Sequence, residues 1–454
     1  MNSASVIGKI LIRGEIVLKS PLLIGDGEGE TSDNFKETSD NFKDIHVQKN
    51  QNNIPYIPGT SLAGVLREFL SEIDSEMTEK IFGDADKMQS SIQIDDIELE
   101  NFKIVSRDGV SIDSLTGIGI KGGKFDYEVV ERGANGNLQM LINLRGCHID
   151  DKNFTEKNYS LEKIKKTATK ILQKLYDGIS LGALTAKGLG KIQAKNISAE
   201  IFDFRKKADV ISWLTDKNSS EKILPSAKEI SANPDNFIVD ADFIFNSSFI
   251  VRDYLNGEKI SEENKISAVS LKSLNDFVIP GTSWKGIFRH RAEYILRKLK
   301  LEKNLDNLLG KAEGEKIKSR LQIEESYISP QNVFEIPHTR NKIDRFTGGT
   351  LQGTLFTTKP VWQKNSAPTL HLHFEIKKAE NFDAGLAIFI LRDLWLGKVA
   401  IGGEKSVGRG TLTGLKAEIK FQGKNYLLGE GGKIIEGDKN ELTKFAAAVR
   451  GEKN

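Results

Sequence analysis

YIPGTSLAGVLREFL at Tyr56–Leu70 is followed much later in the chain by VIPGTSWKGIFRHRA at Val278–Ala292. Both stretches contain Pro-Gly-Thr-Ser, and the shared glycines stand 222 positions apart (281 − 59). We expect Pro-Gly to form a turn and the following Thr or Ser to supply the N-cap oxygen of a helix. Apolar residues then recur at helical spacing. They are Leu62, Val65, Leu66 and Phe69 in the first copy, and Trp284, Ile287, Phe288 and Ile295 in the second. The sequence therefore predicts the same helix start twice.

Four further pairs of blocks repeat in the same order along the chain. They are EIVLKSPLLIGDG (Glu15–Gly27) with DFIFNSSFIVRDY (Asp242–Tyr254), SSIQIDDIEL (Ser90–Leu99) with SRLQIEESYI (Ser319–Ile328), DSLTGIGIKGGKF (Asp113–Phe125) with DRFTGGTLQGTLF (Asp344–Phe356), and LGALTAKGLGKI (Leu181–Ile192) with IGGEKSVGRGTL (Ile401–Leu412). Chance similarity between turn residues would not preserve this order, so the sequence predicts an internal duplication. We expect a first module over 1–205, a polar linker over 206–235 and a second module over 236–454.

Each module has the same predicted order of elements. A strand with alternating apolar residues opens it, as GEIVL or DADFIF. The helix at Pro-Gly-Thr-Ser, further strands, a second helix, a glycine-rich turn and a last strand follow. This order predicts an α+β fold with two tandem ferredoxin-like sheets, each with helices on one face and inserted loops.

The composition limits the class of protein. A chain of 454 residues is too long for one ordinary core, and 38% hydrophobic with 28% charged residues is typical of a globular protein. One cysteine excludes an internal disulfide framework and a cysteine-based zinc site. The start lacks the layout of a signal peptide, because Lys9, Arg13 and Glu15 interrupt its apolar stretch. The default expectation is a cytoplasmic protein without a membrane span.

Cations follow the helix start of the second copy. Lys285, Arg289 and Arg291 come after Thr282 and Ser283. The free N–H groups and the dipole of a helix start favour an anion, so this pattern suits phosphate. The alternative is an ordinary capped helix with a solvated basic face. The prediction of phosphate binding is weaker for the first copy, because it has Thr60, Ser61 and Arg67 but Ala63 in place of Lys285.

Two glycine-rich turns also carry charge. GALTAKGLG (182–190) contains Lys187, and GGEKSVGRG (402–410) contains Lys405 and Arg409. Glycines let a backbone approach a ligand or another backbone closely. Neither turn ends in Gly-Lys-Ser/Thr, so neither fits a P-loop.

The first loop contains the candidate catalytic carboxylates. Residues 25–53 include Asp26, Asp33, Asp40 and Asp44, and ETSDNFK at 30–36 is repeated at 37–43. Such a cluster can hold Mg²⁺ through water, although a solvated loop is the simpler interpretation. The ungapped counterpart of Asp44 is Ile266 (44 + 222), and Asp253, which matches Asp26, is the loop carboxylate retained in the second copy.

Together these blocks resemble the RAMP superfamily. The opening strand, the loop with aspartate, PYIPGTSLAG or VIPGTSWKG, IDR followed by TG, and the closing GG and GRG occur in its order. They are most similar to RNA-binding backbone subunits of type III CRISPR effector complexes, and TRNKIDRFTGGTLQGTLF (339–356) is especially close. The chain thus looks like two such subunits fused, as in subtype III-D variants.

The resemblance implies an RRM-like core, stacking along a guide RNA, and a thumb hairpin around 107–135 and 335–365. It also implies that target RNA is cut at six-nucleotide intervals by a loop aspartate with Mg²⁺ or Mn²⁺. Matched by position, that aspartate and metal ligand is Asp44, with Asp26 and, in the second copy, Asp253 as further catalytic candidates. The implied partners are guide RNA, single-stranded target RNA and other subunits of the complex. The implied RNA-binding residues are Thr60, Ser61, Arg67, Lys187, Thr282, Ser283, Lys285, Arg289, Arg291, Arg345, Lys405 and Arg409.

Three other interpretations stay open from the sequence. The chain can be a guide-binding subunit without cleavage, since the second copy lacks the Asp44 match. It can be a metal-independent, guide-processing endoribonuclease with His46 as base. It can also be an unrelated two-domain protein that binds metal on an acidic loop.

Overall fold

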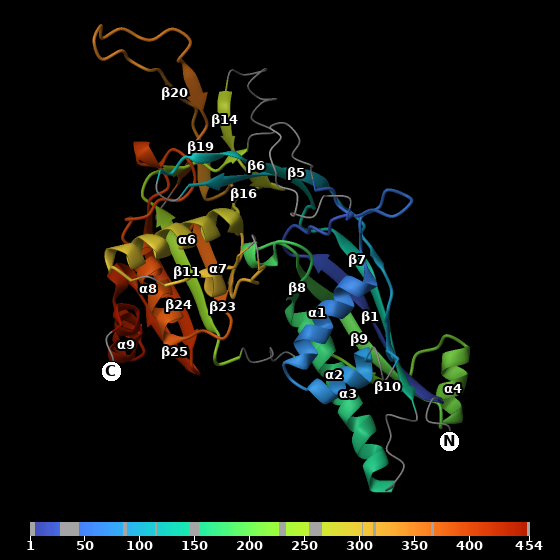
Figure 1. The fold of residues 1–454 in the computed structure, drawn as a ribbon. Coiled ribbons are helices and arrows are strands. Elements are labelled where there is room, and N and C mark those ends of the chain that lie inside the picture. Colours follow the sequence, from blue (N-terminus) through green and yellow to red (C-terminus); the bar gives the residue numbers. More distant parts are fainter. Residues whose placement is uncertain are drawn as a thin grey trace.

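The computed structural model describes residues 5–27, 45–84, 89–113, 116–145, 154–226, 233–253, 266–301, 303–311, 315–364 and 367–451. Within these ranges the chain has a mixed α+β fold with two six-stranded antiparallel sheets (Figure 1). The first sheet runs in the order β10 (Glu221–Ile223), β9 (Lys191–Asp203), β1 (Val6–Leu18), β7 (Asn135–Arg145) and β3 (Ile92–Ile94), with β8 (Ile179–Ser180) also paired to β9. The second runs β17 (Leu321–Ile323), β23 (Leu370–Ile376), β11 (Phe237–Phe245), β24 (Leu412–Phe421), β25 (Lys424–Leu428) and β26 (Ile434–Glu436).

The core of the first half lies between its sheet and its helices. Strand β1 pairs with β7 and β9, with Ile12 opposite Met140 on one side and Ala199 on the other. Side chains of α1 (Gly59–Ser71), α2 (Ser75–Phe82) and α3 (Phe154–Asp177) share one buried cluster with these strands. Figure 1 shows all three helices in front of the sheet. This burial fixes the start of α1 above strand β3.

The second half repeats this packing around β11. Its residues alternate between buried and half-buried, as a strand with one covered face requires. Helices α6 (Gly281–Lys298) and α8 (Asn381–Trp395) pack on the sheet, and α9 (Lys439–Arg450) packs on α8. A Cβ on Gly385 would lie 2.0 Å from the Phe445 carbonyl oxygen, so α8 and α9 are in close backbone contact.

Smaller elements join these layers. The short helices and 3-10 turns are α4 (Lys207–Leu214), α7 (Asp306–Leu309), η3 (Thr185–Lys187), η4 (Lys405–Val407) and η5 (Glu430–Gly432). The remaining strands are β2 (Tyr56–Ile57), β4 (Ile97–Glu98), β5 (Ile104–Ile112), β6 (Gly119–Val130), β12 (Ser248–Phe249), β13 (Arg252–Asp253), β14 (Ile266–Ser270), β15 (Lys272–Ser273), β16 (Asp276–Ile279), β18 (Ser326–Ile328), β19 (Val333–Glu335), β20 (His338–Arg340), β21 (Phe356–Thr358) and β22 (Val361–Gln363). Antiparallel pairs β5–β6 and β20–β21 form hairpins where hairpins were expected.

The predicted helix starts are correct, but the predicted caps are wrong. Helices α1 and α6 begin at Gly59 and Gly281, with Pro58 and Pro280 as N-cap residues and no side-chain cap. The Gly59 N–H instead donates to Asp96 Oδ1 at 2.8 Å. A Cβ on Gly59 would lie 2.1 Å from the Ile94 carbonyl oxygen. Asp96, which lies between β3 and β4, thus takes the capping role, and the close approach of the Ile94 carbonyl requires glycine at position 59.

Much of the stretch expected as a linker is folded. Helix α4 packs against β9, and β10 pairs with β9 at the edge of the first sheet. The Trp213 ring meets the Phe202 ring edge-on with centroids 5.2 Å apart. This aromatic contact and the pairing of β10 with β9 hold the segment on the first half. The described helices include none that is long and apolar enough to cross a membrane.

Candidate functional site

The glycine-rich turn of the first half contacts the helix start of the second half. We call this contact the inner junction. It consists of η3 and Gly188 on one side, and the start of α6 with β17 on the other. A Cβ on Gly281 would lie 2.0 Å from the Lys187 carbonyl oxygen. Gly188 has φ +86°, and a Cβ there would lie 2.6 Å from the Glu325 backbone nitrogen. Both positions require glycine because two backbones from different halves meet here.

Three predicted phosphate-binding cations gather at the inner junction. Lys187 comes from the first half, and Lys285 and Arg289 come from α6. Lys285 is only 8% exposed, and its Nζ donates to the Leu321 carbonyl oxygen at 3.4 Å. Burial, with the charges of Lys187 and Arg289, lowers the pKa of Lys285 to about 7.

The same cluster lowers the pKa of Lys187, through burial and the Arg289 charge. Cations that depress one another in this way lack sufficient negative charge nearby. The dipole at the start of α6 adds to the positive potential. A phosphate group bound here would relieve the repulsion between these cations.

Arg67 and Arg289 have the same structural contact in the two halves. Arg67 Nη2 donates to the Gly83 carbonyl oxygen at 3.3 Å, and Arg289 Nη2 donates to the Gly310 carbonyl oxygen at 2.7 Å. Gly83 and Gly310 are the C-cap residues of α2 and α7. Each arginine therefore holds the end of the short helix that follows, besides adding charge.

The hydroxyl residues of the helix starts lie inside the first turn. Thr60 is exposed, and Ser61, Thr282 and Ser283 are half-buried. The Ser61 and Ser283 N–H groups donate to the Pro58 and Pro280 carbonyl oxygens, each at 2.9 Å. Since none of the four caps its helix, their hydroxyls remain near the anion-attracting end of the helix.

Other predicted cations lie away from the inner junction. Arg291 Nε donates to Asp393 Oδ2 at 2.8 Å and so ties α6 to α8. Arg409 is 5% exposed and is held by Glu404 and Ser248. Lys405 is exposed on η4, and Arg345 is exposed in the segment between β20 and β21. The structure thus brings three of the predicted cations together and disperses these four.

The predicted loop carboxylates have different surroundings. Asp44, with Asp33 and Asp40, lies outside the described residues. Asp26 is exposed, and its backbone N–H donates to the His46 carbonyl oxygen at 3.2 Å. Asp253 is 8% exposed and lines a cavity of about 310 Å³. The matched positions Asp26 and Asp253 therefore sit in solvent and in a cavity, respectively.

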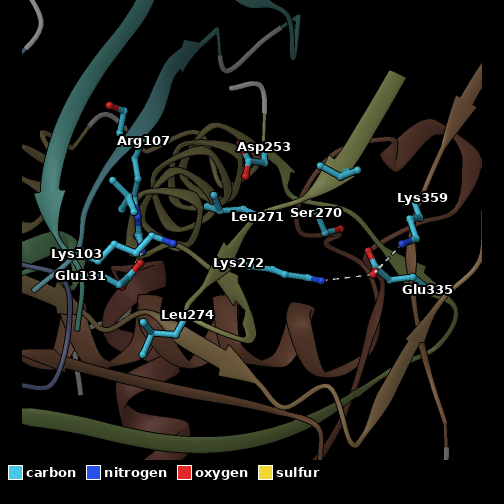
Figure 2. Close-up of a pocket in the computed structure, with 13 residues that line it drawn as sticks. Lys103, Arg107, Glu131, Asp253, Ser270, Leu271, Lys272, Leu274, Glu335 and Lys359 are labelled. Carbon is cyan, nitrogen blue, oxygen red and sulfur yellow. Dashed lines mark hydrogen bonds and ion pairs between the residues drawn. The ribbon is translucent and has the colours of Figure 1, made fainter. Parts of the chain in front are cut away.

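The cavity beside Asp253 is built by both halves (Figure 2). The β5–β6 hairpin and the residues flanking it supply Lys103, Arg107 and Glu131, while Asp253, Ser270, Lys272, Glu335 and Lys359 come from the second half. In Figure 2 Lys272 and Lys359 both point toward Glu335, with Nζ–Oε2 distances of 3.5 and 3.2 Å. Ser270 Oγ is buried without a hydrogen-bond partner. The lysines of the cavity can bind a phosphate group, and a carboxylate in it can accept a proton.

The cavity does not fit a metal ion held by several protein ligands. Glu335 pairs with the two lysines, and Glu131 accepts a hydrogen bond from Ser273 at 2.7 Å and lies 3.8 Å from Arg107. Across the described ranges no group of three or more His, Cys, Asp or Glu side chains can hold a metal ion. The cavity beside Asp253 is therefore lined by both lysines and carboxylates, of which Lys272 and Lys359 pair with Glu335.

A buried ion pair holds the hairpin to the second half. Arg107 Nη1 lies 2.5 Å from Glu325 Oε1, and both side chains are almost fully buried. Burial alone would lower the pKa of Arg107. The negative charges of Glu325 and Glu131 outweigh this effect, so the pKa of Arg107 is raised. Burial raises the pKa of Glu325. No sequence pattern indicates this pair, or Lys103, Lys272 and Lys359, because residues that meet here are far apart along the chain.

Comparison with known proteins gives one family. The model of the RAMP superfamily matches residues 15–193 and 238–413. A search of the curated proteins gives no match to this chain. Among solved structures, the chain is similar to a chain in the cryo-EM structure of the type III-B Cmr-beta bound to cognate target RNA, with 15% identity and a TM-score of 0.29. That match covers 43% of this chain and 61% of the other. Because the family match covers well over half of the sequence in two separate regions, the chain belongs to the RAMP superfamily.

Proposed function

We propose that this chain is a guide-RNA-binding backbone subunit of a type III CRISPR effector complex, acting with other subunits and with target RNA. The observation that carries the proposal is the inner junction, where Lys187, Lys285 and Arg289 meet at a helix start. The family match over both halves and the sequence blocks described above support it. These groups suit phosphates and offer no pattern for reading bases, so base pairing with the guide would supply specificity.

We also propose that the two halves are duplicated ferredoxin-like modules. The order β9-β1-β7-β3 in the first sheet has the same connectivity as β24-β11-β23-β17 in the second. The glycine-rich turns agree in detail: Leu184 and Glu404 have φ 58° and 57°, and Gly188 and Gly408 have φ 86° and 83°. Two independent folds would not be expected to share such left-handed positions.

We assign cleavage of target RNA, at six-nucleotide intervals, to the first half. In this reaction the 2′-oxygen attacks the adjacent phosphorus, the bond to the 5′-oxygen breaks, and the products are a 2′,3′-cyclic phosphate and a 5′-hydroxyl. Asp44 would hold a Mg²⁺ or Mn²⁺ ion, which would stabilise charge on the phosphate. A loop aspartate, Asp44 or Asp26, would accept the 2′-OH proton.

The second half has a different proposed role. The cavity that Asp253 lines contains Lys103, Lys272 and Lys359 besides the carboxylates Glu131 and Glu335, and these lysines suit a phosphate group. We therefore propose that this half grips RNA without metal-dependent cleavage. The alternative is a scaffold, a chain that binds RNA without cleavage in either half.

A second alternative is a metal-independent, guide-processing endoribonuclease. His46 Nδ1 lies 3.5 Å from Glu128 Oε2, a carboxylate that can orient the imidazole as a base. EDTA separates this interpretation from the first, because chelation would stop the metal-dependent reaction and leave the histidine reaction intact.

The test is target-RNA cleavage by the assembled complex with Mg²⁺. Asp44→Ala, Asp26→Ala and Asp253→Ala are compared separately, with guide binding measured in parallel. We expect Asp44→Ala to remove one cut from a six-nucleotide ladder while guide binding persists, and Asp253→Ala to leave the ladder intact. If every cut survives all three substitutions, the chain is a scaffold.

A further inference from the structure

The cavity beside Asp253 has a counterpart in the first half, and the same backbone hydrogen bonds define both places. In each half, one bond joins the segment after the first loop to the opening segment, and another joins it to the hairpin. The bonds are Gln48 N–H to the Ile24 oxygen at 2.8 Å, Leu271 N–H to the Val251 oxygen at 2.7 Å, and Glu128 N–H to the Ile45 oxygen and Lys359 N–H to the Ala268 oxygen, both at 2.9 Å. This correspondence aligns Val47 with Ser270 and Glu128 with Lys359.

The two aligned positions give the second half a different chemistry. Val47 is a buried apolar residue, whereas Ser270 carries a hydroxyl, is 4% exposed and has no hydrogen-bond partner among the described residues. Glu128 carries a carboxylate that accepts from the Val47 N–H at 3.2 Å, whereas Lys359 carries an ammonium group. The second half therefore has an additional hydroxyl donor and an additional cation where the first half has a methyl group and a carboxylate.

Donors from both halves meet in this cavity. Figure 2 shows Lys103 extending into it from the first half and Lys272 from the second. Arg107 Nη2 lies 3.8 Å from Glu131 Oε1 and donates no hydrogen bond within the described part of the chain. A buried donor without an acceptor costs free energy, and here Arg107 and Ser270 both present one. The cavity is therefore suited to a ligand that accepts hydrogen bonds and carries negative charge.

We propose that the cavity binds a phosphomonoester, the terminal phosphate of a nucleotide. Phosphate oxygens are the acceptors that a serine hydroxyl and lysine ammonium groups require. The cavity has a positive net charge, because its lining contains four basic side chains, Lys103, Arg107, Lys272 and Lys359, and three acidic ones, Glu131, Asp253 and Glu335. This inference deepens the RNA-binding role proposed for the second half and rests on that proposal.

The shape and the carboxylates of the cavity favour a monoester over the diester of an RNA strand. Its volume of about 310 Å³ is at the small end of ligand pockets, which span about 300–1,000 Å³. A diester is flanked by sugars on both sides, whereas a monoester can reach the nearly inaccessible Ser270 hydroxyl end-on. A monoester, with a second pKa of about 6, can also carry a proton and donate it in a hydrogen bond to Asp253. A diester has no such proton.

Equilibrium dialysis of the full chain without RNA, against radiolabelled adenosine 5′-monophosphate (AMP), tests this site. The inner junction also attracts phosphate, so the measurement is repeated in the variant Lys187→Ala with Lys285→Ala. We expect a single AMP to remain bound per chain in that variant. Adding Ser270→Val should weaken this binding by about tenfold to a hundredfold, because a hydrogen bond to a charged group is lost.

Two controls separate binding from folding. Ser270→Val should keep the melting temperature of the wild type in the absence of AMP, because Val47 already occupies the aligned place and the lost hydroxyl has no described partner. Lys272→Gln should weaken AMP binding as well. Lys49→Gln is the matched control, because Lys49 is the aligned lysine of the first half, and it should bind AMP like the wild type.

Competition in the Lys187→Ala, Lys285→Ala variant identifies the source of the phosphate. Two RNA oligonucleotides of the same sequence, with a 5′-phosphate or a 5′-hydroxyl, are added to bound AMP. Displacement by the phosphorylated RNA alone supports the proposal with an RNA end as ligand, and displacement by neither supports it with a free nucleotide. Equal displacement by both would overturn it, because internal diesters would then enter the cavity.

The variants also distinguish this inference from the function proposed above. AMP binding that is lost in Lys187→Ala with Lys285→Ala but unchanged in Ser270→Val would support the inner junction and overturn the cavity site. AMP binding that is kept in the double variant and lost in Ser270→Val would support the cavity site whatever the inner junction does. A wild-type chain that binds no AMP would overturn the inference outright.

Discussion

Lys285 is a cation buried among other cations, and its burial has a cost in stability. It is nearly inaccessible to water, and two other cations share its site. The first half has Ala63 at the corresponding position, so it places no ammonium group there. Keeping an ammonium group in such a place costs stability, which is understandable if an anion occupies the site when the protein works.

The first prediction concerns the pH dependence of RNA binding. The pKa of Lys285 is about 7 in the free protein, and a bound phosphate would raise it. We expect RNA affinity to fall as the pH rises above 7, by up to about tenfold per pH unit. Fluorescence anisotropy with single-stranded RNA between pH 6 and 9 measures this.

Lys285→Arg is the control for that titration. Arginine keeps its charge over this range, so the variant should show a flatter profile than the wild type. Identical slopes for the two proteins would show that Lys285 does not bind the phosphate.

A second prediction concerns the histidines of the second sheet. His371 Nδ1 lies 2.9 Å from Asp242 Oδ1, and His371 Nε2 lies 3.4 Å from Asp240 Oδ1. The hydrogen bond to Asp240, together with Asp242, raises the pKa of His371 to about 9. Because the folded pKa exceeds the unfolded value, this stabilisation is complete below about pH 6.5 and is lost as the pH rises through 9.

We therefore expect His371→Asn to lower the melting temperature at pH 6.5 and to have little effect at pH 9.5. Differential scanning calorimetry at the two pH values measures the difference. His290→Asn on α6 is the matched control for the loss of a histidine side chain. An equal loss for His371→Asn at both pH values would contradict the assignment.

At the scale of elements, the sequence predicted which segments form and missed how they are held. The helix starts at Gly59 and Gly281 follow from Pro-Gly and helical spacing. Their caps could not be predicted, because the group that accepts from Gly59, Asp96, is on another segment. Sequence patterns indicate each of the three cations of the inner junction separately. Their proximity depends on the packing of the two halves against each other.

Arg291 and Arg409 illustrate the same limit at the candidate site. Their basic character and position suggested RNA contacts, yet each is bound to a carboxylate, Asp393 and Glu404 respectively. Asp393 lies about a hundred positions after Arg291 and is fully buried, so local spacing carries no information about it. A basic residue can be predicted to be exposed only where the fold places no buried carboxylate against it.

The third prediction concerns the ion pair between the β5–β6 hairpin and the second half. Glu325→Gln would leave the buried Arg107 guanidinium with less compensating charge. We expect a loss of about 3 kcal/mol in the free energy of unfolding. Urea denaturation followed by circular dichroism measures it.

Glu324→Gln is the matched control one residue away. Glu324 pairs with Lys191, but both side chains are partly exposed. Its loss should therefore cost less than about 1 kcal/mol. Equal effects of the two substitutions would show that the buried pair has no special role in joining the halves.

At the scale of the whole molecule, the two halves form one composite surface. Backbone contact at Gly188 and Gly281, the Arg107–Glu325 pair and the cavity beside Asp253 all use both halves. The order of repeated blocks predicted two similar modules, but a repeat in sequence does not say which faces meet. The site therefore depends on an arrangement that only the folded chain reveals.

RNA binding across the inner junction is the most direct test of the account. Affinity for single-stranded RNA of guide length is measured as a function of salt, for the wild type, for Lys187→Ala with Lys285→Ala, and for the exposed control Lys416→Ala. We expect the double variant to bind at least about tenfold more weakly, with a salt slope smaller by about 1.4 for two lost phosphate contacts. The control should bind like the wild type. A double variant with unchanged affinity and salt slope would contradict the claim that the junction of the two halves holds RNA.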